Sequence, residues 1–197
     1  MRWWGFHELE GGAVMSEEIV EPLNQDPGPD PHAGGLGRAI NQIGVVFAVG
    51  ILVAAGILVI EIFLRYVLNS PTIWAHETVI FLTASAFVYG GLYAVARNAH
   101  IRVVLIYDFL TKPVRRYFDI AISITCFLAT GMFAWAAWKG VQRAIWTPAG
   151  DFRLETSGSA WNPPTPGLLK VFLLFILIIM TVQFLILAIA YFKNKEH

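Results

Sequence analysis

Four long blocks of apolar residues, each close to the length needed to cross a lipid bilayer, constrain this chain most strongly. They cover about residues 43–64, 78–96, 120–138 and 171–192. A helix needs roughly 20 apolar residues to cross the ~30 Å hydrocarbon core, whereas a β-barrel would need short segments of alternating polarity. Only 14% of the residues are charged, against about 25% in soluble domains. The sequence therefore predicts an all-α integral membrane protein with four transmembrane helices.

The segments around these spans predict a division into three parts. Residues 1–37 are acidic and rich in glycine and proline, a composition that cannot bury a core and that indicates a disordered tail. Residues 38–192 make up the four-helix membrane domain, and residues 193–197 a cytoplasmic tail. Met15 precedes Ser-Glu-Glu and is a second candidate start. We therefore hypothesise that the natural protein begins at Met15 and that residues 1–14 come from an over-extended gene start. The first residues lack the long apolar core of a signal peptide.

Lysine and arginine counts on the two sides of the spans predict the orientation. Eight lie near the membrane on the side of the loop between spans two and three, and five lie on the other side. Both termini are therefore expected to be cytoplasmic. Residues 100–110 in that loop are too few to cross the membrane and are apolar almost all round. This pattern predicts a short interfacial helix between spans two and three.

Glu61 lies near the end of the first span, and Arg65 follows one helical turn later on the same face. This spacing predicts an ion pair that fixes the depth of the helix. An unpaired carboxylate at mid-bilayer would cost roughly 2.5–3.5 kcal/mol. A contact with a partner subunit or a lipid headgroup is one alternative, and a proton-coupling role for Glu61 is another.

The second span has a marked beginning. Ser70 and Pro71 predict the N-cap and the first helical residue. Trp74 suits the membrane interface, and Glu77 lies near the positive end of the helix dipole.

Further along the same span, Ala86, Gly90 and Ala94 recur every four residues. This spacing predicts one face at which another helix approaches closely, either within the subunit or from a partner.

The sequence lacks the residue sets of an enzyme or a cofactor site. No histidine lies in the middle of a span, which argues against a haem protein. There is no Cys/His cluster with zinc spacing, no phosphate loop and no dinucleotide fingerprint. Cys126 is the single cysteine and is interpreted as a packing residue within the third span. A formal net charge of zero argues against a nucleic-acid partner. We therefore expect no catalysis, no metal and no cofactor.

Several short sequence motifs occur in a characteristic order along the four spans. They are Arg65-Tyr66, Asn69, Trp74, Glu77, Tyr89-Gly90-Gly91, His100-Ile101-Arg102-Val103, the SGSAWNPP stretch at 157–164, and Gln183. In this order and spacing the chain resembles the small permease subunit, of the DctQ type, of TRAP (tripartite ATP-independent periplasmic) transporters. The resemblance covers about residues 38–192. Many family members carry an acidic residue where this chain has Val104, and Asp108 lies one turn further along.

The resemblance implies a function that composition alone does not. TRAP systems of the bacterial inner membrane import organic acids, usually carboxylates, with a sodium gradient. A periplasmic binding protein delivers the substrate to a large, DctM-type membrane subunit that holds the substrate and sodium sites. The small subunit braces the scaffold of the large subunit and helps to dock the binding protein. The resemblance therefore implies that this chain itself binds neither substrate nor sodium.

We expect contacts with these partners or with phospholipid at eleven positions. They are Glu61, Arg65, Asn69, Trp74, Glu77, Ala86, Gly90, Ala94, His100, Arg102 and Trp161. Simpler interpretations remain open at this point, such as an interfacial belt residue for Trp74 and lipid-phosphate contacts for His100 and Arg102.

An alternative function is a self-sufficient, homo-oligomeric, proton-coupled transporter that uses Glu61. Small multidrug exporters also combine four spans with a glutamate in the first. Here, however, Glu61 lies near the end of its span and not at the midplane, where an alternating site belongs.

Overall fold

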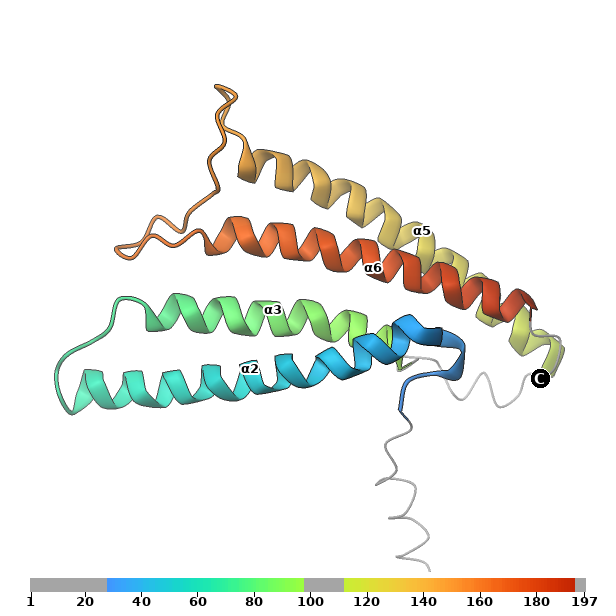
Figure 1. The fold of residues 1–197 in the computed structure, drawn as a ribbon, viewed down its shortest axis with the longest axis horizontal. Coiled ribbons are helices and arrows are strands. Elements are labelled where there is room, and N and C mark those ends of the chain that lie inside the picture. Colours follow the sequence, from blue (N-terminus) through green and yellow to red (C-terminus); the bar gives the residue numbers. More distant parts are fainter. Residues whose placement is uncertain (1–27, 98–111, 194–197) are drawn as a thin grey trace, which may run out of the picture.

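The computed structural model describes residues 28–97 and 112–193 (Figure 1). In these ranges a short 3-10 helix, η1 (Pro31–Ala33), precedes four α-helices. The α-helices are α2 (Gly34–Tyr66), α3 (Ala75–Ala96), α5 (Lys112–Ile145) and α6 (Thr165–Lys193). All four are long and apolar enough to cross a membrane, which confirms the predicted all-α class with four spans. The predicted interfacial helix at 100–110, with His100 and Arg102, lies outside the described residues.

The helices extend beyond the predicted spans. α2 begins at Gly34, so the boundary predicted after residue 37 falls inside this helix and residues 34–37 are not part of a disordered tail. α5 is 34 residues long, whereas the predicted span covers 120–138. A hydropathy pattern detects only the part of a helix that faces hydrocarbon, and polar turns continue into the headgroup layer.

The predicted beginning of the second span is wrong. α3 begins at Ala75 with Trp74 as its N-cap residue, and Ser70 does not cap it. The backbone N–H of Ser70 instead donates to the carbonyl of Leu64 at 3.0 Å and closes the end of α2. Residues 67–74 are needed to reverse the chain, and Asn69 takes a left-handed φ of 51° there.

The four helices lie side by side in the order α2, α3, α6, α5 (Figure 1), as two antiparallel hairpins that meet along α3 and α6. The two inner helices, α3 and α6, are more buried than the two outer ones. In the most apolar stretch of each helix, 39% of the residues are buried in α3 and 28% in α6, but only 6% in α2 and 11% in α5. The subunit is therefore a layer of helices whose two outer members expose most of their apolar surface.

The first and last described segments meet at one end of the layer, which we call the η1 end. The N–H of Asp30 donates to the carbonyl of Ala96 at 3.1 Å, and the Gln183 side-chain amide donates to the carbonyl of Ala33 at 3.2 Å. These bonds join η1 to α3 and α6. The opposite end, the loop end, holds the connections 67–74 and 146–164. The side of the membrane on which each end lies stays a prediction.

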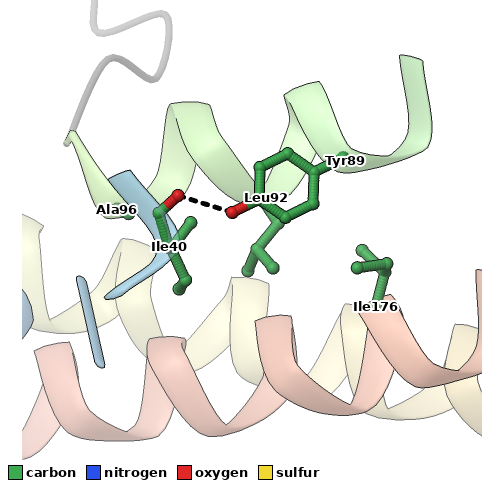
Figure 2. Close-up of a cluster of buried hydrophobic side chains, with 5 residues drawn as sticks. All are labelled: Ile40, Tyr89, Leu92, Ala96 and Ile176. Atoms are coloured by element: carbon green, nitrogen blue, oxygen red, sulfur yellow. Dashed lines mark hydrogen bonds between the residues drawn. The ribbon is translucent and has the colours of Figure 1, made fainter. Parts of the chain in front are cut away.

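A buried cluster joins α2, α3 and α6 near the η1 end (Figure 2). It consists of Ile40, Tyr89, Leu92, Ala96 and Ile176. The hydroxyl of Tyr89 donates to the carbonyl of Ile40 (Figure 2), so this buried polar group is satisfied. Close approach of α2 and α3 also requires a glycine, because a Cβ at Gly44 would lie 2.7 Å from the ring of Tyr93.

Candidate functional site

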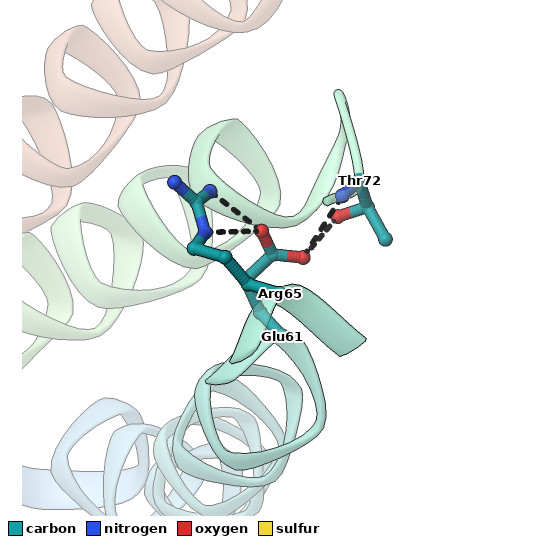
Figure 3. Close-up of polar contacts among 3 residues, drawn as sticks. All are labelled: Glu61, Arg65 and Thr72. Atoms are coloured by element: carbon teal, nitrogen blue, oxygen red, sulfur yellow. Dashed lines mark hydrogen bonds and ion pairs between the residues drawn. The ribbon is translucent and has the colours of Figure 1, made fainter. Parts of the chain in front are cut away.

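Glu61 forms the predicted ion pair with Arg65 (Figure 3). The Nη2 and Nε atoms of Arg65 lie 2.6 and 3.2 Å from Oε1 of Glu61. Thr72 donates to Oε2 from its hydroxyl at 2.6 Å and from its backbone N–H at 3.2 Å. Thr72 lies eleven residues away across the turn, so the spacing within one helix does not predict its contact with Glu61. Glu61 therefore holds the α2–α3 connection at the end of its span.

Glu77 joins the two hairpins across the loop end. It lies in the first turn of α3, as predicted, and its Oε1 accepts a hydrogen bond from the hydroxyl of Ser157 at 2.9 Å. The segment around Ser157 is itself ordered by local bonds, since the side chain of Asn162 accepts from the N–H of Gly158 at 2.9 Å. The SGSAWNPP stretch thus has a structural role that its resemblance alone does not reveal.

The long α5–α6 connection is attached to both helices that it joins. Backbone N–H groups of Arg153 and Glu155 each donate at 2.8 Å to carbonyls in the last turn of α5. Glu155 also pairs with Lys170 of α6. Gly167 allows this close approach, because a Cβ there would lie 2.8 Å from Cγ of Leu154.

Two tryptophans remain accessible at the loop end. Trp74 is 41% exposed and Trp161 is 44% exposed. Trp74 directly precedes α3, and Trp161 follows the segment that Ser157 ties to Glu77. Because these segments are held by hydrogen bonds, the two indoles belong to a fixed surface. Asn69 lies at the neighbouring α2–α3 turn.

The predicted small-residue face of α3 is divided between the interior and the surface. Ala86 is buried, Ala94 is half-buried and Gly90 is exposed. Ala86 and Gly90, with Gly44 and Ala48 of α2, line an open groove of about 390 Å³ between the two helices. We call it the small-residue groove. A Cβ at Gly90 would meet no atom within 4 Å, so this face is not filled by the subunit itself.

A larger groove lies between α2, α3 and α6 and has a volume of about 530 Å³. Its lining is almost entirely apolar and includes Phe47, Phe81 and Phe172. Within the ranges 28–97 and 112–193, no group of three or more His, Cys, Asp or Glu residues is placed to hold a metal ion. The described surfaces are therefore suited to lipid and protein contacts.

Comparison with known proteins agrees with this picture. Residues 54–194 match the family described as tripartite ATP-independent periplasmic transporters, DctQ component. The chain is also 22% identical over 138 residues to the sialic acid TRAP transporter small permease protein SiaQ of Vibrio cholerae. That match covers 70% of this chain and 80% of the relative. The chain therefore belongs to the DctQ family, and it is a small permease component of a TRAP transporter and not an enzyme.

Proposed function

We propose that the chain braces the scaffold of a large, DctM-type permease subunit in a sodium-coupled importer of organic acids in the bacterial inner membrane. This proposal rests on the exposure of the two outer helices, α2 and α5. α2 has 33 residues, and only 6% of its most apolar stretch is buried within the subunit. A layer of four helices that buries so little of its outer members has extensive surface for a membrane partner.

The state of Glu61 supports an accessory role for this chain. Both carboxylate oxygens are engaged by Arg65 and Thr72, and the side chain lies at the end of α2. A coupling carboxylate of a self-sufficient transporter would instead belong near the midplane, with access to the transport path. On this basis, the substrate and sodium sites reside in the large subunit.

The loop end is the proposed docking surface for the periplasmic binding protein. With both termini cytoplasmic, this end faces the periplasm. Trp74 and Trp161 are exposed there on segments held by the Glu77–Ser157 bond. Tryptophans on a rigid surface are common anchors of protein interfaces. The substrate of the Vibrio cholerae relative is sialic acid, which is itself a carboxylic acid, so an organic acid is the proposed substrate class here.

Isolation of the chain from its native membrane in a mild detergent tests this function. We expect a second membrane protein with several times more spans to co-purify in a fixed ratio, as identified by mass spectrometry. When the periplasmic binding protein is added, it should then bind to this complex and co-purify with it. Recovery of this chain only with copies of itself, in a form that transports substrate in liposomes, would contradict the proposal.

Glu61→Gln separates the brace from a proton-coupled transporter. The substitution removes the charge from an ion pair whose Arg65 side chain is half exposed and therefore screened by solvent, so we expect only a partial loss of assembled complex. Uptake per assembled complex, and its dependence on pH, should stay unchanged in liposomes. Glu155→Gln, which removes the ion pair with Lys170 outside the span, is the matched control. Complete loss of uptake by assembled Glu61→Gln complexes would instead assign the coupling role to Glu61.

A further inference from the structure

A hollow of about 450 Å³ lies at the loop end of α5. Its lining residues are Lys139, Gln142, Arg143, Trp146, Thr147 and Pro148. Lys139 and Arg143 are four residues apart and therefore lie on one face of the helix. Both are exposed, and within the described ranges neither forms an ion pair. The hollow thus presents two positive charges without a compensating carboxylate from that part of the chain.

The ammonium group of Lys139 has a defined position. It lies 3.8 Å from the centroid of the Trp135 ring, in a cation–π contact. This contact places the charge beside an exposed aromatic side chain on the same face of α5. Arg143 lies one turn closer to the end of the helix. The two positive charges therefore lie one helical turn apart, and the first of them is next to an apolar surface.

The depth of Lys139 and Arg143 along α5 matches the lipid headgroup layer. Asp119 and Lys139 bracket 19 uncharged residues of α5, a length of about 29 Å at 1.5 Å per residue. This is close to the ~30 Å hydrocarbon core, and the headgroup layer adds roughly 5–7 Å on each side. Lys139 therefore marks the hydrocarbon boundary. Arg143 lies about 6 Å further out, at the level of lipid phosphates.

The surface below Lys139 on the same face is apolar. Leu128, Met132 and Trp135 precede it at helical spacing and are 58%, 73% and 64% exposed. A soluble anion would gain nothing from this stripe, whereas the acyl chains of a lipid would cover it. The combination of a basic hollow and an apolar stripe on one helix face therefore favours a lipid over a free phosphate ion.

We propose that this hollow binds the phosphate group of a membrane phospholipid in the leaflet on the loop-end side. Lys139 and Arg143 donate charge-assisted hydrogen bonds to the phosphate oxygens. The acyl chains lie along Leu128, Met132 and Trp135. The site belongs to this chain alone and does not depend on the large subunit.

Native mass spectrometry of the full chain in detergent, titrated with phosphatidylglycerol, tests the site. Each basic charge near a membrane surface contributes on the order of fivefold in lipid affinity. The double variant Lys139→Gln/Arg143→Gln should therefore bind the lipid on the order of 25-fold more weakly. Arg153→Gln/Lys193→Gln removes the same charge elsewhere and should bind normally. Lys139→Arg/Arg143→Lys keeps the charge and should also bind.

Three results would overturn the lipid site. The first is unchanged lipid affinity in Lys139→Gln/Arg143→Gln, or an equal loss in the Arg153→Gln/Lys193→Gln control. The second is displacement of the lipid by inorganic phosphate at equal concentration, which would identify a site for soluble anions. The third is weaker docking of the periplasmic binding protein with normal lipid binding, which would assign the basic pair to a protein partner. Circular dichroism checks helix content, and the single variants should each show the fivefold effect.

Discussion

Gly90→Leu should weaken the binding of the large permease subunit by roughly 5–150-fold, so that little of it is recovered with the purified chain. Gly90 is exposed and lines the small-residue groove between α2 and α3. A side chain can begin there without a clash in the isolated subunit, because a Cβ at this position meets no atom within 4 Å and faces an open groove of about 390 Å³. It would, however, occupy space in the groove into which we propose that a helix of the large subunit packs. Overpacking costs about 1–3 kcal/mol, which corresponds to roughly 5–150-fold in affinity.

Gly91→Leu is the matched control for this prediction. Gly91 is also exposed and also has open space at its Cβ, but it does not line the groove. Both substitutions raise helix propensity by a similar amount, so a change confined to position 90 reports on the groove. The readout is the ratio of the two subunits after affinity purification. Equal recovery with leucine at either position would show that the large subunit binds a different face.

The second large effect is expected inside the subunit, at the η1 end. Gln183 is fully buried in α6, and its amide holds the carbonyl of Ala33. Gln183→Glu replaces this donor with a carboxylate directed at a carbonyl oxygen. A charge within a transmembrane helix costs roughly 2.5–3.5 kcal/mol. For a chain of this length we expect the unfolding temperature in detergent to fall by roughly 5–14 °C.

The unfolding temperature can be measured at the single cysteine of the chain. Cys126 of α5 is half-buried and packs against the cluster formed by Ala33, Val95, Phe184 and Leu187. A thiol-reactive fluorophore therefore reports the opening of this cluster on heating. Gln183→Met keeps the size but loses only a neutral hydrogen bond worth about 1 kcal/mol, so it should unfold at an intermediate temperature. A Glu variant as stable as the Met variant would mean that position 183 does not hold a charge in an apolar site, because the carboxyl group is protonated or water reaches it.

Local patterns in the sequence were sufficient for the helices and for one contact. The four spans follow from hydropathy, and the Glu61–Arg65 pair follows from the geometry of a single helix. The predicted N-cap at Ser70 was wrong because Ser70 belongs to the turn that closes α2, where its backbone N–H donates to Leu64, and α3 begins only at Ala75. A local pattern does not show how many residues the turn takes.

The remaining contacts depend on how the helices pack. Glu77 and Ser157 are 80 residues apart, and Gln183 and Ala33 are 150 apart. Such pairs form only after the hairpins meet along α3 and α6, and an apolar span has no strong polar face that would fix its rotation in advance. For the same reason, the repeat of Ala86, Gly90 and Ala94 indicated a packing face but not which members would remain open.

The arrangement of the helices also has a mechanical consequence. The ribbons converge at the η1 end and spread toward the loop end (Figure 1). The bonds of Asp30 to Ala96 and of Gln183 to Ala33 hold the narrow end, and the wide end would separate most if the hairpins tilted about it. With a length near 50 Å for the 33 residues of α2, a pivot of about 5° would move its far end by about 4 Å. The Glu77–Ser157 bond at the wide end opposes such a movement, so it also fixes the spacing of the two exposed tryptophans.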